Sequence, residues 1–410
     1  MLDALFDHID ASRDTVIDLQ RSLVSIPALH ADAGGQGEEN KAEFMRNYLR
    51  DMGIEPVTYK CPDTSVECGF RPNVAGVIPG KDTSRTFWVI THLDVVPPGD
   101  LTLWDTDPYE LQVADDGDTI IGRGVEDNHQ GLVSSILVAK ALNDKNITPP
   151  INYGLLFVAD EETGSHYGLG YMLRENEHLF SKNDLFLIPD FGDSTSEHVE
   201  VAEKSMLWVK FVVKGKQCHA SRPQDGVNSL VASAAYIMKL LKLHEIFDKK
   251  NVLFKPANST FEATKKEANV ENVNTIPGRD VFYIDCRILP EYDLDNVLSK
   301  IKEMGHEIEK AFGVTITSEV TQREVAAPPT PVTSEIVTRM IDSIKNVYAC
   351  DPEPVGIGGG TVAAVLRRKG YDAVVWSTLI QNAHQPNERS SIRYTIGDAK
   401  VMAGVLFKED

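Results

Sequence analysis

Side chains that can bind metal follow four short apolar runs of this sequence. The runs and the residues after them are 86–90 with His92 and Asp94, 152–159 with Glu161 and Glu162, 184–188 with Asp190, and 372–377 with His384. Short, almost continuously apolar runs are typical of parallel strands covered on both faces. Because ligands bind at the carboxyl ends of such strands, we expect these side chains to converge at one sheet edge. Two histidines and several carboxylates, without thiolates, suit Zn²⁺ or a similar divalent ion.

Each of these residues also has an ordinary explanation when it is taken alone. Asp127 precedes a predicted helix that begins near Asn128, so it would serve as the N-cap of that helix. His92, Glu162 and His384 would be solvated loop residues. Their coincidence at predicted strand ends favours a common metal site over four separate explanations.

The elements that must position these residues alternate between helical and extended patterns. Helices are predicted at 2–24, 38–52, 128–142, 333–347, from Thr361 onward and at 397–407. After Glu203 the predicted order is strand 206–213, helix 227–247, strands 252–261 and 280–288, helix 294–312 and strand 314–319. That βαββαβ order is typical of a ferredoxin-like domain. The proline-rich segment 326–331 predicts an extended connector that returns the chain to the first domain.

These patterns predict an α/β domain interrupted by an inserted α+β domain. The expected boundaries are 1–203 for the first part of the catalytic domain, 204–323 for the insert, and 324–410 for the second part. We therefore expect one catalytic domain built from two distant parts of the chain.

Composition and charge exclude several classes of partner. The 410 residues include 41 Lys+Arg against 61 Asp+Glu, a formal net charge of −20, so nucleic acid and anionic membranes are not expected partners. No apolar run approaches the roughly 18 residues of a membrane span, and the acidic start does not resemble a signal peptide. The five cysteines are scattered, which favours reduced thiols and a cytoplasmic protein.

Seven short motifs together resemble those of a known enzyme family. They are His92-Leu-Asp-Val-Val-Pro97, Gly122-Arg-Gly-Val-Glu-Asp127, Asp160-Glu-Glu-Thr-Gly164, Pro189-Asp190, His219-Ala-Ser-Arg-Pro223 with Gly226-Val-Asn228, Asn274-Thr-Ile-Pro277 and His384-Gln-Pro-Asn-Glu388. In order and over nearly the whole chain, they resemble the co-catalytic zinc family of acetylornithine deacetylase, succinyl-diaminopimelate desuccinylase, aminoacylases, carboxypeptidases and dipeptidases. The resemblance implies a zinc-peptidase-like α/β domain with an inserted dimerisation or lid domain.

The resemblance also implies a role for each metal-capable residue. Asp127 would bridge two Zn²⁺ ions per subunit, with Co²⁺ or Mn²⁺ as alternative ions. The remaining implied ligands are His92 and Asp190 for one ion and Glu162 and His384 for the other. Asp94 would orient His92, and Glu161 would act as the general base that takes the proton of the attacking water.

Further residues are implied to contact the substrate. His219 would reach the active site of a partner subunit and donate to the developing oxyanion, which implies a homodimer, although a loop histidine beside Cys218 is the plain alternative. Arg287 would grip a substrate carboxylate, and an ion pair on an exposed strand is an equally good explanation. The other implied substrate-binding residues are Asn274, Gly359, Gly360 and Thr361.

Two departures from the family pattern bear on the substrate. The family commonly has Lys where this chain has His129, which is either an extra ligand or, by preference, a solvated histidine of the first helical turn. Asp190 stands where Glu is usual. The expected activity is a metal-dependent amidohydrolase that cleaves N-acyl amino acids, with a dipeptidase, tripeptidase or carboxypeptidase as the alternative. A non-catalytic metal-dependent binding protein is a remote alternative.

Nucleotide and serine chemistry are both disfavoured by the sequence. The glycine stretch 356–360 lacks a Walker lysine and the spacing of a dinucleotide fingerprint, and no GxSxG motif occurs. The expected substrate is therefore a small N-acyl amino acid or short peptide.

Overall fold

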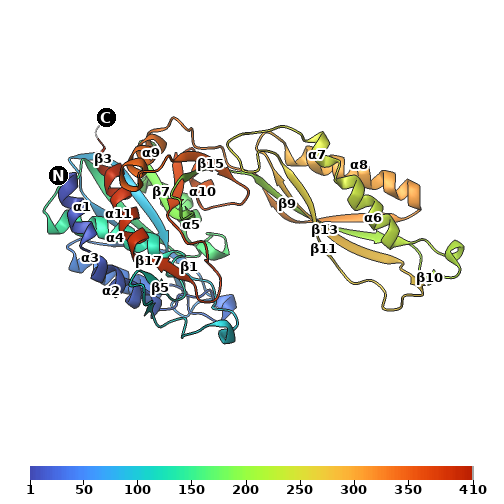
Figure 1. The fold of residues 1–410 in the computed structure, drawn as a ribbon, viewed down its shortest axis with the longest axis horizontal. Coiled ribbons are helices and arrows are strands. Elements are labelled where there is room, and N and C mark those ends of the chain that lie inside the picture. The colour runs from blue at the N-terminus through green and yellow to red at the C-terminus, as the bar shows by residue number, and fades with distance from the viewer. Residues whose placement is uncertain (409–410) are drawn as a thin grey trace. The chain divides into compact units, whose positions relative to one another are not determined.

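The computed structural model describes residues 1–408, which form two compact units. Unit 1 contains Met1–Val201, Pro329–Pro354 and Thr361–Asp410, the blue to green and the orange to red parts of the ribbon in Figure 1. Unit 2 contains Ala202–Pro328 and the short segment Val355–Gly360. This last segment lies within residues 324–410, the predicted second part of the catalytic domain, whereas it packs with the insert.

Unit 1 is built around the largest sheet, of which only residues 202–203 and 355–357 belong to unit 2. Its strands are β1 (Val57–Pro62), β2 (Phe70–Ile78), β3 (Asp82–His92), β6 (Ile151–Val158), β7 (Leu185–Gly192), β8 (His198–Glu203), β15 (Glu353–Ile357) and β16 (Ala373–Ser377). They lie in the order β1-β2-β6-β3-β7-β16-β8-β15. The central strands β6, β3, β7 and β16 are parallel, whereas β1 pairs antiparallel with β2, β2 with β6, and β8 with β16. The predicted parallel centre is therefore present.

Helices cover both faces of this sheet. They are α1 (Leu2–Asp10), α2 (Arg13–Val24), α3 (Glu39–Asp51), α4 (His129–Asp144), α5 (Leu169–Glu175), α9 (Glu335–Tyr348), α10 (Ala363–Arg368) and α11 (Ile392–Phe407). Trp88 and Ile90 of β3 pack in one cluster with residues of α5 and α10. On the other face, Tyr153 of β6 donates its hydroxyl to the main-chain oxygen of Ser135 in α4. Because successive strand residues face opposite sides, burial on both faces explains the continuously apolar runs.

Unit 2 is the predicted ferredoxin-like domain. Its elements are β9 (Ser205–Lys214), α6 (Ser229–Leu240), α7 (Leu243–Ile246), β11 (Thr260–Lys266), β13 (Arg279–Ile288), α8 (Leu294–Phe312) and β14 (Thr315–Glu324). The antiparallel sheet has the order β11-β13-β9-β14. One apolar cluster joins Phe211 and Phe282 of the sheet to Tyr236 of α6 and Ile301 of α8. The two helices therefore share one core with the sheet.

Several local predictions are wrong in instructive ways. The helix predicted over 2–24 is two helices, because the chain turns at Ala11 and Ser12 and the Ser12 hydroxyl caps the carbonyl of His8. The helix predicted over 227–247 is interrupted after Leu240 by a tighter turn. The segment 252–259 is not a strand, since the buried Lys204 ammonium binds the carbonyl groups of Pro256 and Asn258 and holds a loop there.

Three further features complete the description of residues 1–408. The small sheet β17 (Arg389–Ser391), β5 (Thr119–Ile121) and β4 (Gln112–Val113) pairs the end of the chain with its first third. All five cysteines are free thiols. Among residues 1–408, no helix is both long enough and apolar enough to cross a membrane.

Candidate metal centre

The parallel strands bring distant residues to one sheet edge. His92 is the last residue of β3 and pairs with Val158 at the end of β6, so the turn Glu161–Thr163 that follows β6 begins beside it. Asp190 lies near the end of β7, the neighbour of β3 on its other side. The convergence expected from strand ends is therefore present in unit 1.

The first histidine lies at the floor of the site. His92 is 2% exposed, and its Nε2 lies 2.9 Å from Oδ1 of Asp127 and 3.7 Å from Oδ1 of Asp190. The Nδ1 of His92 is 2.9 Å from the main-chain oxygen of Asp94. Donation of the Nδ1 proton to that carbonyl leaves the Nε2 lone pair free for a metal ion.

The second histidine lies at the rim of the site. His384 is 52% exposed, and its Nε2 lies 3.1 Å from Oδ2 of Asp127 and 3.1 Å from an oxygen of Glu162. The two carboxylate oxygens of Asp127 thus face two different histidines. This is the arrangement that a carboxylate bridging two cations requires.

The donor atoms lie close enough together to hold metal. Ligand atoms of His92, Asp127 and Glu162 lie within 4.8 Å of one another, and so do those of His92, Glu161 and Asp190. Imidazole nitrogens with carboxylate oxygens suit Zn²⁺ and related divalent ions. The residues present therefore fit a divalent metal centre.

The electrostatics of these side chains favour positive charge at the site. Hydrogen bonds with Asp127 and Glu162 raise the pKa of His384 to about 10. Although burial alone would lower the pKa of His92, its contacts with Asp127 and Asp190 raise that pKa well above the ordinary value. Burial, followed by repulsion from Asp190, raises the pKa of Glu161 well above the ordinary carboxyl value. These pKa shifts reflect the several carboxylates that crowd the site. Bound divalent cations would offset their negative charge.

Asp94 positions the turn that carries two of the candidate residues. Its carboxylate accepts the main-chain N–H groups of Glu161 and Glu162 at 3.1 and 3.0 Å, and lies 3.5 Å from Nδ1 of His92. Sequence analysis assigned Asp94 only the orientation of His92. The structure adds that Asp94 links the end of β3 to the turn after β6.

Glu126 positions the loop that carries His384, a role that sequence analysis missed. The buried Glu126 carboxylate accepts the main-chain N–H groups of Ile380, Gln381 and Asn382 at 2.5, 2.9 and 2.7 Å. Gln381 and His384 have positive φ angles of 68° and 64°, a conformation that non-glycine residues rarely adopt. Glu126 therefore supplies hydrogen bonds that stabilise a strained loop.

Glu388 makes the reciprocal contact. Its buried carboxylate accepts the main-chain N–H groups of Gly124, Glu126 and Asp127 at 2.9, 3.0 and 3.0 Å, and Arg123 pairs with it at 2.6 Å. Each of the two loops therefore holds the other through a buried glutamate. The signal in the sequence was the acidic residue beside each candidate ligand motif, but its partners are main-chain groups that carry no sequence signature.

His129 is buried, so the preferred prediction of a solvated first-turn histidine is wrong. It is 0% exposed, and its Nε2 accepts a hydrogen bond from the Lys41 ammonium at 2.7 Å. Lys41 comes from α3 and is itself 1% exposed. Burial lowers the pKa of Lys41 to about 7, against the attraction of Asp94 and Glu38. The Lys41 ammonium group comes from α3, far from His129 in the sequence, so no local motif around His129 could indicate this contact.

The implied substrate residues of the insert lie in unit 2. His219 in β10 (Cys218–His219) pairs with Thr275 in β12 (Thr275–Ile276), next to Asn274. Nδ1 of His219 accepts the main-chain N–H of Ser221 at 3.1 Å, which places the proton of a neutral ring on Nε2. His219 and Asn274 are both exposed. An exposed Nε2–H is suited to donate a hydrogen bond to a ligand.

Arg287 makes the ion pair that was its alternative explanation. Its Nε and Nη2 donate to Asp285 at 2.7 and 2.9 Å, and Nη1 donates to the main-chain oxygen of Gly358 at 2.9 Å. Two of its five N–H groups are left by these bonds. Gly359 and Gly360 follow in the same unit, and an added Cβ at Gly359 would meet nothing within 4 Å. Thr361 begins the next segment of unit 1.

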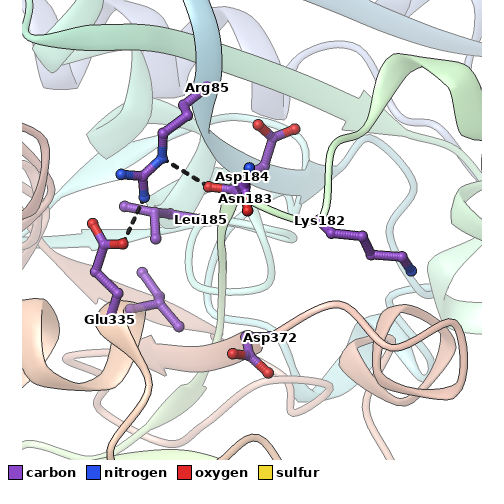
Figure 2. A pocket seen from close by; sticks show the side chains of 8 residues that line it. Arg85, Lys182, Asn183, Asp184, Leu185, Glu335 and Asp372 are labelled. Atoms are coloured by element: carbon purple, nitrogen blue, oxygen red, sulfur yellow. Dashed lines mark hydrogen bonds and ion pairs between the residues drawn. The ribbon is translucent and has the colours of Figure 1, made fainter. Parts of the chain in front are cut away.

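A separate polar cavity lies at the amino-terminal ends of β7 and β16, whereas the candidate metal ligands lie at the carboxyl ends of strands. It has a volume of about 320 Å³ and is lined by residues that precede or begin β7 and β16, with Arg85 of β3 and Glu335 of α9 (Figure 2). Arg85 donates to the main-chain oxygen of Asn183 at 2.9 Å and to Glu335 at 2.6 Å. These contacts tie α9 to the strand starts. The cavity is therefore distinct from the candidate metal centre.

Comparisons with known proteins agree with this geometry. Residues 88–408 match the family described as "Peptidase family M20/M25/M40". The chain is 42% identical to an uncharacterised metallohydrolase of Methanocaldococcus jannaschii, over 96% of this chain and 99% of that protein. It is 26% identical to succinyl-diaminopimelate desuccinylase of a Nitratiruptor species, over 92% of this chain and 94% of that protein.

Solved structures share the fold. Aminopeptidase PepT of Bacillus cereus superimposes with a TM-score of 0.74 at 18% identity, covering 96% of this chain and 98% of that one. The metallo-carboxypeptidase Sso-CP2 of Sulfolobus solfataricus gives a TM-score of 0.69 at 20% identity, covering 95% and 98%. The family expected from the motifs is confirmed: this chain belongs to peptidase family M20/M25/M40 and is a metal-dependent hydrolase of amide bonds.

Proposed function

We propose that this protein hydrolyses the amide bond of an N-acyl amino acid at a centre of two divalent ions, Zn²⁺ by preference. The observation that carries the proposal is the position of Asp127 between His92 and His384, with Glu161 beside this set. His92 and Asp190 would hold one ion, Glu162 and His384 the other, and Asp127 both. When bound, such a pair of ions lowers the pKa of water and polarises the substrate carbonyl.

Glu161 is suited to move the proton in this reaction. Its side chain lies in the group with His92 and Asp190, and its raised pKa brings the carboxyl group closer to the operating pH of a general base. Glu161 would take a proton from the attacking water at a carboxylate oxygen and give it to the leaving amine. Asp94 accepts the main-chain N–H of Glu161 and so fixes the backbone position from which the Glu161 side chain extends.

The inserted unit is proposed to supply the remaining groups in a homodimer. His219 would donate its Nε2–H to the developing oxyanion in the partner subunit's site, because its Nδ1 is already an acceptor. Asn274 and the glycine stretch with Gly359, Gly360 and Thr361 would contact the amino acid half of the substrate. A fully active monomer would contradict the assignment of His219.

A dipeptidase, tripeptidase or carboxypeptidase is the second candidate function. It is supported by the folds of PepT and Sso-CP2, and of human carnosine dipeptidase 1, which covers 99% of this chain with a TM-score of 0.71 at 16% identity. A peptide and an N-acyl amino acid present the same amide and carboxylate. A non-catalytic binding protein is disfavoured because Glu161 accompanies the full set of candidate ligands.

A hydrolysis screen tests the proposed function. Purified protein loaded with Zn²⁺ or Co²⁺ would be assayed against N-acetyl and N-succinyl amino acids and short peptides, with and without a chelator. We expect release of free amino acid that the chelator abolishes and added metal restores. Hydrolysis that survives complete metal removal would overturn the proposed function, and cleavage of peptides alone would favour the second candidate.

Arg287→Ala is expected to raise KM about tenfold or more while changing kcat less. Arg287 is proposed to bind the substrate carboxylate, and a hydrogen bond to a charged group contributes about 1.5 to 3 kcal/mol. Because this contact would be made in both the ground state and the transition state, its loss should weaken substrate binding more than turnover. Steady-state kinetics on the best substrate of the screen would measure this. Arg279→Ala, at the start of the same strand β13, is the matched control. An unchanged KM in the Arg287 variant would limit the role of Arg287 to its contacts with Asp285 and Gly358.

A further inference from the structure

A largely apolar cavity adjoins one of the candidate metal ligands. It has a volume of about 360 Å³ and reaches Glu162. Its apolar walls are Ala33, from the loop after α2, and the consecutive residues Val95, Val96 and Pro97, which follow β3. All of these residues belong to unit 1, so the cavity does not depend on the insert.

The loop that forms one wall is held in place by main-chain contacts. Val95 donates its N–H to the carbonyl of Ala28 at 3.1 Å, and Gly37 donates to the carbonyl of Leu29 at 3.0 Å. An added Cβ at Gly35 would lie 2.1 Å from the oxygen of Leu29, so the loop closes tightly on itself. The wall is therefore part of a built cavity and is suited to select a ligand by shape.

The ionisable side chains around the cavity are mostly acidic. Its lining contains the carboxylates of Asp32, Asp94 and Glu162, and none of the lining residues is Lys or Arg. The one basic side chain is His30, whose Nδ1 accepts the main-chain N–H of Asp32 at 3.1 Å. A carboxylate placed against the walls away from Glu162, and so away from any ion that Glu162 holds, has no Lys or Arg among the lining residues to pair with.

We infer that this cavity binds the acyl half of the substrate, and that the acyl group is apolar and carries no carboxylate. The inference rests on the proposed function, in which the substrate is an N-acyl amino acid or peptide. The amino acid half of such a substrate carries a carboxylate, which this cavity disfavours. The acyl half is the remaining part next to the scissile carbonyl, and it would lie beside Glu162.

The inference separates this chain from its desuccinylase relatives in substrate. A succinyl group ends in a carboxylate, whereas a butyryl group has the same number of carbon atoms and no charge. Each methylene that the acyl group buries in the cavity is worth about fourfold in transition-state binding. We therefore expect a preference for neutral acyl chains of a few carbons.

The test compares N-acetyl, N-butyryl, N-hexanoyl and N-succinyl derivatives of one amino acid on the metal-loaded, full-length protein. The expected result is a kcat/KM that rises from acetyl to butyryl by about sixteenfold, with N-succinyl at least about a hundredfold below N-butyryl. Val96→Arg places a cation at the partly exposed wall and is expected to raise the succinyl to butyryl ratio at least about tenfold. Val57→Arg, at an exposed position of β1, is the control and should leave the ratio unchanged.

Two outcomes would overturn the inference while the proposed function stands. One is equal use of N-succinyl and N-butyryl substrates by the unmodified protein, and the other is a ratio that Val96→Arg does not change. If no derivative is hydrolysed, the proposed function fails and calorimetry decides about the cavity. Butyramide binding at least about tenfold tighter than succinamate would then support the inference, and equal or absent binding of the two would overturn it.

Discussion

Glu161→Gln is expected to retain its metal and to lose turnover by about a hundredfold to ten-thousandfold. The amide has nearly the same shape as the carboxylate but cannot accept the proton of the attacking water. Glu161 stands beside His92 and Asp190, and the main-chain bond from Glu161 to Asp94 is unaffected by the substitution. The fold and the five candidate ligands are therefore expected to remain.

The measurement combines metal analysis with kinetics. Metal content per chain would be determined by elemental analysis, and kcat would be measured on the best substrate found. Glu175→Gln, at the exposed end of α5, is a matched control that should have normal kcat. Near-normal turnover in Glu161→Gln would refute its role as general base, and loss of metal would instead show that Glu161 is a ligand.

Glu126→Ala is expected to lower metal binding from the proposed two ions per chain to one and to reduce kcat by at least about a hundredfold. The substitution leaves three main-chain N–H groups of 380–382 without their acceptor, each at a cost of about 1 to 3 kcal/mol. Without these hydrogen bonds, nothing would offset the conformational cost of the positive φ angles of Gln381 and His384. His384 would leave its position between Asp127 and Glu162, whereas His92 and Asp190 would keep theirs.

Metal titration followed by calorimetry distinguishes this effect from general destabilisation. Glu126→Gln keeps the shape of the side chain and one acceptor oxygen, so it should recover only part of the second metal site, whereas a purely steric role would predict full recovery. Glu43→Ala, at an exposed position of α3, is the control. Two ions bound with unchanged affinity in Glu126→Ala would exclude Glu126 as a positioning residue for His384.

Much of the site could be predicted because its residues follow strands. The apolar runs before His92, Glu161 and Asp190 place these residues at one edge of a parallel sheet by the geometry of the sheet alone. His384 was harder, because it lies on a loop beyond β16 and its place depends on Glu126. The βαββαβ order likewise followed from local patterns, and its strand order in unit 2 agrees.

The rest depended on contacts that leave no local pattern. Glu126 and Glu388 bind main-chain N–H groups, which every residue carries, so no partner type could be sought in the sequence. Lys41 meets His129 only because α3 lies near the start of α4. The glycine stretch packs with unit 2 because an added Cβ at Gly356 would lie 2.5 Å from the ring of Phe254, a contact between residues about a hundred positions apart.

The reciprocal hold of the two loops also determines when the site can form during synthesis. Glu126 is translated 254 residues before Ile380 and 262 residues before Glu388. Until that segment arrives, Asp127 lacks the acceptor of its main-chain N–H and Glu162 lacks His384. A nascent chain that lacks this segment therefore holds four of the five candidate ligands, and the complete centre requires the arrival of His384.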